Sequence, residues 1–294
     1  MPTAMPSDKR LELPHFDVSE FVRRVLAEDM GSGGDVTSDA TIAADARFAA
    51  EMNCREPITV AGLDITIAFF RALDREVRVR KEVGDGDRVP AGTVLVRLDG
   101  HARAMLAAER SALNTLQHLS GIATLTGRYA DAIEGTGAVL LDTRKTVPGL
   151  RLLAKYAARM GGAQNHRMRL DDGVLIKDNH VAVCGGVEAA VAAARKANIG
   201  LPVQCEVDRI EQIEPAIAAG ADRLLLDNMA PDMLREAVRI VAGRVPLEAS
   251  GGVNLDTIRP IAETGVDFIS VGRITQSAPA VDIGLDYSLQ ELPA

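Results

Sequence analysis

Apolar and polar positions in the second half of the chain follow two alternating periods. Six short apolar runs predict strands, at residues 138–141, 174–176, 202–207, 223–226, 246–249 and 267–271. Five amphipathic stretches predict helices, at residues 150–160, 187–197, 209–219, 231–241 and 255–264. Strands that alternate with helices in this way form a parallel sheet, which is either closed into a barrel or left open with helices on both faces.

The chain before these repeats has a different pattern. From Ala46 to about Leu98 it is strand-like, and residues 76–83 alternate valine with arginine at the period of a half-buried strand. A long helix is expected from about His101 to Thr126, with an apolar stripe at helical spacing. Glu109 projects into this stripe and Arg110 lies on its edge. A carboxylate among apolar side chains needs a partner or becomes protonated.

Polar residues at the ends of the expected strands favour a barrel over an open sheet. They follow nearly every strand of the second half: Asp142, Thr143, Arg144, Lys145, Lys177, Glu206, Asp227, Ser250, Gly251 and Gly252. Barrel enzymes carry their chemistry at the carboxyl ends of the strands, whereas an open sheet gathers ligands at one switch point. Six strands are fewer than the eight of a regular barrel.

A basic segment lies within an acidic chain. The formal net charge is −8, yet residues 144–177 contain eight Lys or Arg and only two Asp. Cations that come from several loops suit a small polyanionic ligand. The alternative is a solvated face of the helix 150–160, which accounts for Arg151, Lys155 and Arg159. It does not account for the cations at strand ends and in loops, namely Arg144, Lys145, Arg167 and Lys177.

Two glycine-containing turns and two carboxylates lie at the same strand ends. Ser250–Gly251–Gly252 and Gly272 follow consecutive strands, and such a pair lets backbone N–H groups approach phosphate oxygens. Tight turns that need positive φ are the alternative. Glu206 and Asp227 could hold Mg²⁺, bind sugar hydroxyls or stabilise a developing cation. From spacing alone, simple pairing with the neighbouring cations is an equal alternative.

The composition narrows the class of protein. Apolar residues make up 47% and charged residues 25%, as in globular proteins, and no stretch has the apolar length of a membrane helix. Residues 1–17 contain no apolar core of signal-peptide type. Three cysteines without a C-x-x-C motif indicate reduced thiols and a cytoplasmic location. An acidic chain with few aromatic residues is not expected to bind nucleic acid, and the histidines lack metal-ligand spacing.

Several motifs resemble those of the quinolinate phosphoribosyltransferase family. They are EDMGSGGDVTSD from Glu28, ERSALNTLQHLSGIAT from Glu109, LDTRKTVPGLR from Leu141, GGAQNHRMRLDDGVLIKDNH from Gly161, EV from Glu206, LLLDN from Leu224, LEASGG from Leu247 and ISVG from Ile269. The resemblance extends from about Glu28 to Tyr287. It implies an N-terminal α/β sandwich domain over residues 1–121, with 275–294 packing back on it, and an irregular, incomplete α/β barrel over 122–274.

The resemblance also implies an activity and its residues. The family transfers phosphoribosyl from 5-phosphoribosyl-1-diphosphate to quinolinate with Mg²⁺, and yields nicotinate mononucleotide, diphosphate and CO₂ for NAD biosynthesis. The quinolinate-binding residues would be Arg110, Thr143, Arg144, His166, Arg167 and Lys177. Lys145, Glu206 and Asp227 would be catalytic, with the two carboxylates also as metal ligands. Phosphate and ribose would be bound by Lys145, Glu206, Asp227, Ser250, Gly251, Gly252, Val271, Gly272 and Arg273. A homodimer, or a hexamer, would place the helix that carries Arg110 at the partner's active site.

Two positions depart from the family pattern, and two rival functions remain. Arg273 stands where a small residue is usual and Gln276 where a basic one is common, so we expect Arg273 to supply the phosphate-binding charge. A surface arginine that caps the turn is the alternative. One rival is a relative that acts on another base, such as the phosphoribosyltransferase-like protein associated with molybdate transport. The other is a non-catalytic binding protein. Retention of Arg110, Arg144, Arg167, Lys145, Glu206 and Asp227 argues against both.

Overall fold

The computed structural model describes residues 13–288, which fall into two compact units. The first unit contains the described residues up to Leu125, together with Leu152–Gly161 and the described residues from Ala278 onward. The second unit contains Thr126–Arg151 and Gly162–Ser277. Residues 1–12 and 289–294 of the expected sandwich domain lie outside the described residues. The observed units differ from the expected boundaries chiefly in one helix, residues 151–160, which belongs to the first unit.

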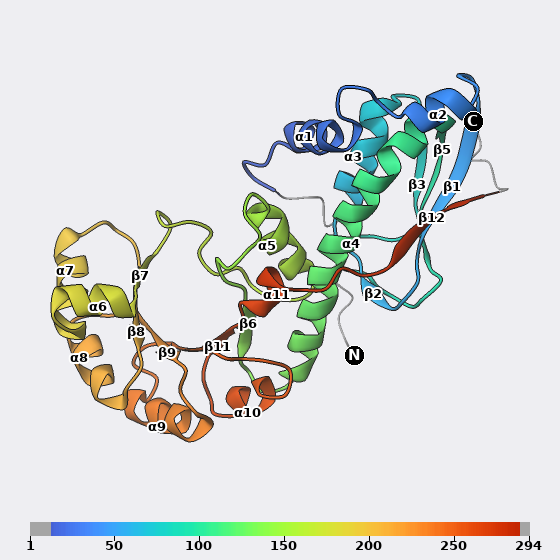
Figure 1. Ribbon diagram of the computed structural model, residues 1–294. Helices are drawn as coiled ribbons and strands as arrows, with labels where there is room; N and C mark the ends of the chain where they lie inside the picture. The colour runs from blue at the N-terminus through green and yellow to red at the C-terminus, as the bar shows by residue number, and fades with distance from the viewer. Residues whose placement is uncertain (1–12, 289–294) are drawn as a thin grey trace. The chain divides into compact units, whose positions relative to one another are not determined.

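The first unit is built on an antiparallel sheet in the order β12-β1-β5-β3. Its strands are β12 (Ile283–Tyr287), β1 (Arg47–Cys54), β5 (Val94–His101) and β3 (Arg78–Lys81). A small second sheet pairs β2 (Ile58–Thr59) with β4 (Arg88–Val89). The helices of this unit are α1 (Val18–Met30), α2 (Val36–Thr41), α3 (Leu63–Leu73), α5 (Arg151–Met160) and most of α4 (Ala102–Ala132). In Figure 1, α3 and α4 lie along one side of the main sheet.

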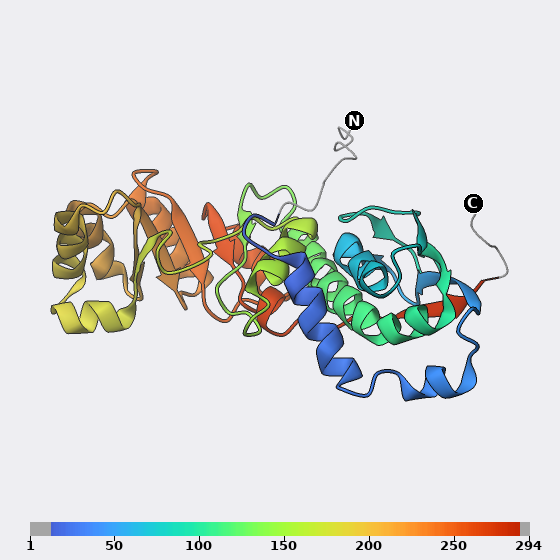
Figure 2. The same ribbon diagram turned by 90° about the horizontal axis from the view of Figure 1, so that it is seen from above.

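One expectation for this unit is wrong, because α3 is a helix within the segment expected to be strand-like. Its sequence contains Ile65-Thr66-Ile67, a β-branched run that favours a strand. Tertiary contacts decide otherwise. The Asp85 carboxylate accepts hydrogen bonds from the N–H groups of Gly62 (2.7 Å) and Leu63 (3.1 Å) at the start of the helix. α1 packs against α3 (Figure 1), and Figure 2 shows the same unit from above. The helix therefore forms through capping and burial rather than through propensity.

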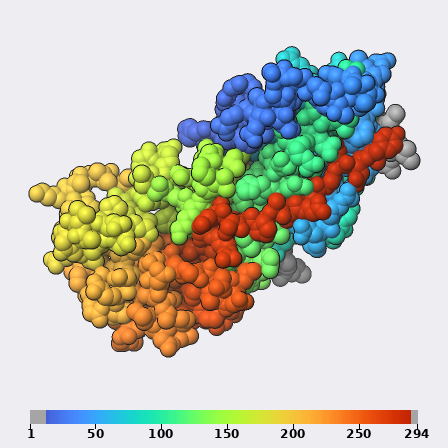
Figure 3. All heavy atoms as spheres, viewed as in Figure 1, coloured from blue at the N-terminus to red at the C-terminus, as the bar shows by residue number. Residues whose placement is uncertain are grey.

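The last described residues return to the first unit. β12 pairs antiparallel with β1, and Gln117 of α4 donates a hydrogen bond of 2.8 Å to the carbonyl of Ile283. The preceding turn lies so close to α4 that a Cβ on Gly121 would be 2.1 Å from the carbonyl oxygen of Pro279. Only glycine fits this approach. The segment (red) crosses the surface of the unit in Figure 3.

The helix α5 does not have the solvated basic face that its sequence suggests. Lys155 is fully buried and engaged in an interaction, and the neighbouring Tyr156 is buried as well. The Tyr156 hydroxyl donates a hydrogen bond of 2.5 Å to Asp85, the carboxylate that caps α3. Burial, followed by the charge of Asp85, raises the pKa of Tyr156 far above its usual range. This helix is therefore part of the packing of the first unit, although it follows the first barrel strand in sequence.

The second unit is a six-stranded parallel sheet in the order β6-β11-β10-β9-β8-β7. Its strands are β6 (Val139–Leu141), β7 (Val174–Ile176), β8 (Val203–Val207), β9 (Arg223–Asp227), β10 (Leu247–Ser250) and β11 (Phe268–Ser270). Among the strands in residues 13–288, β6 and β7 form the two open edges, so the barrel is incomplete. This confirms the expected fold class and the six predicted strands, with bounds that shift by only one residue.

Helices cover the outer side of the parallel sheet (Figure 1). They are α6 (Asp178–Cys184), α7 (Val187–Ala197), α8 (Ile213–Ala218) after the short 3₁₀ turn Ile210–Gln212, α9 (Pro231–Val241) and α10 (Ile258–Ala262). The short helix α11 (Arg273–Gln276) follows the carboxyl end of β11. The patterns that predicted α7 and α9 give their bounds without error. α10 begins later than expected because the Asn254 side chain accepts hydrogen bonds from the N–H groups of Asp256 and Thr257 and forms a turn there. Within residues 13–288, no helix has the length and apolar character to cross a membrane.

Candidate active site

Alternation along the strands of the second unit separates an apolar outer face from a polar inner face. On β9, Leu224 and Leu226 are fully buried, whereas the intervening Leu225 and the final Asp227 line a cavity. The register aligns Leu225 with Glu206 on β8 and with Glu248 on β10. Because successive side chains point to opposite faces, one parity of residues faces the helices and the other faces the interior.

The inner face opens into a cavity of about 750 Å³ at the carboxyl ends of the strands, a volume suited to small molecules. It is lined by all the expected site residues of this unit, namely Thr143, Arg144, Lys145, His166, Arg167, Lys177, Glu206, Asp227, Ser250, Gly251, Gly252, Val271, Gly272 and Arg273. Arg110 belongs to the first unit. Its side chain is exposed on α4.

One part of the cavity holds two partly buried arginines. Burial, and next the repulsion from Arg144, lower the pKa of Arg167, while Asp172 opposes this shift. The buried Nε of Arg144 has no hydrogen-bond partner within residues 13–288. Arg167 donates one hydrogen bond of 2.9 Å, to the carbonyl of Gly173. Two guanidinium groups that repel each other in a partly dry site are stabilised by an anion placed between them.

The Asp142 carboxylate, directly after β6, forms hydrogen bonds to the loop that carries Arg167. Asp142 is fully buried, and its carboxylate accepts hydrogen bonds from the Asn165 side chain (2.5 Å) and from the His166 N–H (2.8 Å). Both ring nitrogens of His166 also face protein groups. Nδ1 accepts from the Arg167 N–H at 2.8 Å, and Nε2 lies 3.2 Å from the Gln204 side-chain oxygen. His166 also lines the cavity, and its contact with a substrate carboxylate stays a prediction.

Lys177 and Glu206 form an ion pair across the ends of β7 and β8. The pair is asymmetric in exposure, because 40% of the Lys177 side chain but only 9% of the Glu206 side chain reaches solvent. Glu206 also lies 3.5 Å from the N–H of Asp178. The simple pairing that the sequence left open is thus present for Glu206. Because the ammonium remains accessible, it can still contact an anion in the cavity.

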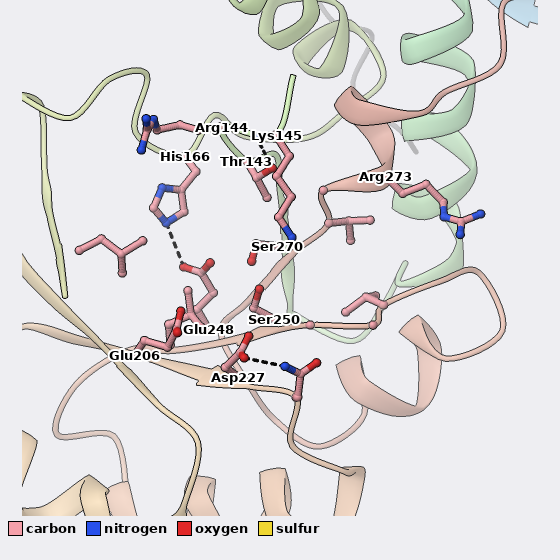
Figure 4. Close-up of a pocket in the computed structure, with 18 of the residues that line it drawn as sticks. Thr143, Arg144, Lys145, His166, Glu206, Asp227, Glu248, Ser250, Ser270 and Arg273 are labelled. Carbon is pink, nitrogen blue, oxygen red and sulfur yellow. Dashed lines mark hydrogen bonds and ion pairs between the residues drawn. The ribbon is translucent and has the colours of Figure 1, made fainter. Parts of the chain in front are cut away.

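Lys145 and the glycine turns line a further part of the cavity. The Lys145 side chain points into the cavity toward Ser270 in Figure 4. Its N–H donates to Thr143 at 3.0 Å, and its carbonyl accepts from the Thr275 hydroxyl at 2.8 Å. A Cβ on Gly272 would lie 2.8 Å from the Lys145 Cδ. The absence of a side chain at Gly272 therefore gives Lys145 its path into the cavity.

Asp227 and Ser250 lie side by side at the ends of β9 and β10. Asn228 has a positive φ of 56° and donates a hydrogen bond of 2.6 Å to the Asp227 carboxylate. Its N–H also donates to the Ser250 carbonyl at 2.8 Å, and a Cβ on Gly251 would lie 2.2 Å from its side-chain oxygen. Gly251 is thus needed for a close approach as well as for its φ of 92°. Bare backbone at this turn suits a phosphate group.

The orientation of Arg273 does not support the expected phosphate-binding role. Figure 4 shows its side chain directed away from the labelled cavity residues, although the residue borders the cavity. Arg273 begins the short helix α11 and is exposed. Gln276 at the end of this helix also lines the cavity. The geometry thus favours the alternative of a surface arginine at the turn.

Glu206 and Asp227 could supply some, but not all, of the ligands of a metal ion in the cavity. Within residues 13–288, no three His, Cys, Asp or Glu side chains are grouped to hold a metal ion. Glu206 and Asp227 are hard oxygen donors on neighbouring strands, and Lys177 and Asn228 already contact them. Mg²⁺ commonly uses one or two carboxylates and takes its remaining ligands from water and substrate phosphates. The two residues fit a metal that arrives with a phosphorylated substrate.

Three polar residues of the interior were not expected from the sequence as part of the site. Gln204 and Glu248 are buried side chains on β8 and β10, and Ser270 ends β11. Gln204 lies two residues before Glu206, and Glu248 lies two residues before Ser250. Ser270 lies two residues before Gly272, which was also expected in the site. That spacing was the available signal, because residues two apart on a strand share a face.

Sequence comparisons with protein families and with known proteins agree on one family. Residues 35–120 match the N-terminal domain and residues 122–286 the C-terminal domain of quinolinate phosphoribosyl transferase. The chain is 44% identical over 277 residues to the nicotinate-nucleotide pyrophosphorylase (carboxylating) of Mycobacterium leprae, covering 92% of this chain and 98% of the relative. The probable nicotinate-nucleotide pyrophosphorylase (carboxylating) of Bacillus subtilis is 39% identical over 276 residues, with 94% and 95% covered.

Solved structures agree with the sequence comparison. The nicotinate-nucleotide pyrophosphorylase of Francisella tularensis has a TM-score of 0.88 and 40% identity, and the match covers 97% of this chain and 98% of that one. The corresponding structure from Ehrlichia chaffeensis has a TM-score of 0.89 and 39% identity, with 93% and 100% covered. The similarity thus includes both units of the chain.

Proposed function

The chain belongs to the quinolinate phosphoribosyltransferase family, and from this premise we propose how the cavity residues divide the reaction between them. The enzyme transfers phosphoribosyl from 5-phosphoribosyl-1-diphosphate to quinolinate. The products are nicotinate mononucleotide, diphosphate and CO₂, and the reaction is a step of NAD biosynthesis. The observation that carries the division of roles is that Arg144 and Arg167 line the same cavity as Lys145 and the glycine turns, because each substrate is a polyanion.

The two carboxylates of quinolinate bind at Arg144 and Arg167. Support comes from the mutual repulsion of these guanidinium groups and from the unpaired Nε of Arg144 within the described chain. Lys177 also lines the cavity and adds a third cation. Charge-assisted pairs with planar carboxylates are the strongest contacts that arginine makes. They explain why a base with two carboxylates is selected.

The phosphorylated sugar binds along Lys145, Gly272 and the Ser250–Gly252 turn, with Glu206 and Asp227 beside the ribose. The pyridine nitrogen attacks C1 of the ribose while the bond to diphosphate breaks, and the carboxylates stabilise the positive charge that develops on the sugar. Lys145 stabilises the departing diphosphate. The nitrogen is then quaternary, so the ring accepts the electron pair of the adjacent carboxylate as CO₂ leaves. The ring carbon finally takes up a proton.

Mg²⁺ is the cofactor that we propose for this reaction. Support comes from the two oxygen donors, Glu206 and Asp227, and from the phosphate oxygens that the substrate would add. When bound, the ion neutralises negative charge on the diphosphate.

We propose a homodimer in which each cavity receives Arg110 from the partner subunit, with a hexamer of three such dimers as the alternative assembly. Support comes from two observations on α4. Arg110 is exposed on the first unit, whereas the residues that line the cavity belong to the second unit. Burial raises the pKa of the adjacent Glu109, although Arg110 opposes this shift. A twofold interface would repeat such a contact in both directions. We also propose a cytoplasmic location, which the free thiols of Cys54, Cys184 and Cys205 support.

The activity is tested by incubating purified protein with quinolinate, 5-phosphoribosyl-1-diphosphate and Mg²⁺. We expect nicotinate mononucleotide and CO₂ in equal amounts. Nicotinic acid, which lacks one carboxylate, should be a very poor substrate because one cationic group would stay unpaired. Efficient turnover of nicotinic acid would contradict the assignment of Arg144 and Arg167 to two carboxylates.

A further inference from the structure

The interior of the barrel contains a buried carboxylate for which the reaction has no direct use. Glu248 lies in the middle of β10, and its side chain has no exposure to solvent. Burial raises the pKa of this group, but hydrogen bonds from the side chains of His166, Gln204 and Ser270 oppose burial, and the pKa is lowered overall. Glu248 is therefore a carboxylate, and its buried charge requires partners.

Glu248, Gln204 and His166 form a closed triangle of polar contacts. The Gln204 side-chain N–H₂ donates to the Glu248 Oε2 at 2.8 Å, and its oxygen lies 3.2 Å from the His166 Nε2. The His166 Nε2 is also 3.4 Å from the Glu248 Oε2. Figure 4 shows the imidazole above Glu248, with the ring nitrogen pointing down to the carboxylate.

The contacts of His166 determine its tautomer. The Arg167 N–H donates to Nδ1 at 2.8 Å, so Nδ1 is an acceptor and carries no proton. Nε2 therefore carries the proton and donates it toward Gln204 and Glu248. The Gln204 amide fits this arrangement in one orientation only, because a flipped amide would direct its oxygen at the Glu248 carboxylate. Each member of the triangle thus fixes the others.

Arg223 supplies a positive charge beneath the triangle. It begins β9 opposite Gln204, and one of its terminal nitrogens lies 3.7 Å from the Glu248 Oε2. Its guanidinium carbon stacks 3.6 Å from the ring centroid of Phe268. A cation held by an aromatic face at this position stabilises the buried carboxylate without forming a direct hydrogen bond to it.

We propose that Glu248, Gln204 and Arg223 are positioning residues that hold His166 as the Nε2–H tautomer. The bond from the Arg167 N–H to Nδ1 then fixes the backbone of Arg167, the residue assigned to a quinolinate carboxylate. His166 acts in this way as a link between the barrel interior and the substrate site. The alternative is that a protonated His166 contacts the carboxylate itself. The inference rests on the proposed role of Arg167, but its first test below does not depend on activity.

The first test is the ¹⁵N NMR spectrum of the histidine side chains in the wild-type protein near neutral pH. A His166→Asn variant identifies the His166 signals among the five histidines of the chain. We expect a protonated Nε2 and an unprotonated Nδ1. In Glu248→Gln this preference should be lost, and the two tautomers should become mixed. A wild-type ring that is protonated on both nitrogens, or on Nδ1 alone, would overturn the proposal.

The second test is kinetic. Glu248→Gln should raise KM for quinolinate roughly ten-fold or more, while KM for 5-phosphoribosyl-1-diphosphate changes less than about two-fold. Glu248→Asp should partly restore quinolinate binding. Glu236→Gln, the same change at an exposed residue of α9, is the matched control and should have wild-type kinetics. If Glu248→Gln does not fold, Gln204→Met tests the same triangle with a neutral side chain of similar length.

The outcomes separate this proposal from the proposed function. Equal increases in both KM values, or an unchanged KM for quinolinate in a folded variant, would overturn the positioning role. A wild-type protein that makes no nicotinate mononucleotide would instead contradict the proposed function. In that case the NMR spectrum still decides whether the interior carboxylate fixes His166.

Discussion

At the scale of single residues, we expect selectivity for quinolinate to depend on which cations of the basic segment 144–177 are partly buried. Arg167 and Arg169 are two residues apart, but their environments differ. Arg169 is exposed and pairs with Asp171 at 2.9 Å, whereas burial and the nearby Arg144 lower the pKa of Arg167. Screening by water makes an exposed pair contribute little, while a partly dry guanidinium gains strongly from a substrate carboxylate.

We therefore predict that Arg167→Ala weakens quinolinate binding by about 2–5 kcal/mol, because one substrate carboxylate loses its charged partner. Arg169→Ala is the matched control and should leave binding nearly unchanged. Isothermal titration calorimetry with quinolinate measures both. Similar losses in the two variants would mean that only the overall charge of the segment matters.

The path of Lys145 depends on the missing side chain at Gly272. The φ of Gly272 is −66°, which any residue can adopt, so Gly272→Ala tests crowding without backbone strain. We predict that the added methyl group displaces Lys145 and lowers kcat/KM for 5-phosphoribosyl-1-diphosphate roughly ten-fold. The melting temperature should hardly change. Steady-state kinetics with the sugar substrate varied provides the measurement.

Arg273→Ala is the neighbouring control for this prediction. Because the Arg273 side chain is directed away from the cavity (Figure 4), its removal should change KM for 5-phosphoribosyl-1-diphosphate less than about two-fold. A large increase in this KM would restore the hypothesis that Arg273 replaces the charge that Gln276 lacks.

At the scale of elements, one partly buried carboxylate, that of Asp85, joins two helices of the first unit. Asp85 accepts hydrogen bonds from the two N–H groups at the start of α3 and from the Tyr156 hydroxyl of α5. A carboxylate at the start of a helix also interacts favourably with the helix dipole. The arrangement explains how α5 can belong to the first unit although the barrel strands β6 and β7 flank it in sequence.

Tyr156→Phe removes only the hydroxyl from this arrangement. We predict that it lowers the free energy of unfolding by about 1.5–3 kcal/mol, the usual contribution of a hydrogen bond to a charged group. Urea denaturation followed by circular dichroism is the measurement. Tyr287→Phe, at a residue that is 68% exposed, should have no measurable effect. If the free energy of unfolding of Tyr156→Phe equals that of the wild type, packing alone holds α5 in the first unit.

At the scale of the whole molecule, the expected site residues of the second unit line one cavity, whereas Arg110 belongs to the first unit. If the partner subunit supplies Arg110, the Arg110→Ala and Lys145→Ala variants should each be inactive alone. After subunit exchange, a mixed dimer would contain one cavity with both residues intact. We predict that mixing restores up to about a quarter to a half of wild-type activity.

Subunit exchange must be shown independently, for example by energy transfer between labelled subunits. Mixing Lys145→Ala protein with an Arg167→Ala variant is the control, because both residues line the same cavity of one chain. That mixture should stay inactive, since every cavity of the mixed dimer would lack one of the two residues. Activity in the control, or none in the test mixture after exchange, would contradict a shared site.

The sequence by itself determined the elements of the second unit and the residues at their ends. Strand and helix periods are local properties, so β7, α7 and α9 were predicted with their bounds. In a parallel barrel all strands end at one rim, so residues such as Lys145, Glu206 and Asp227 could be grouped before any contact was known. The family motifs lie at these same ends and added the identity of the substrates.

Only the tertiary structure decided matters that depend on which surfaces meet. The β-branched run of α3 favours a strand, and the basic pattern of α5 suggests a solvated face, but packing and the Asp85 carboxylate override both. The contacts of Glu248 with Gln204, Arg223 and His166 join residues from β10, β8, β9 and a loop. Their distances depend on strand order and register, which arise from long-range pairing and are not encoded in any local period.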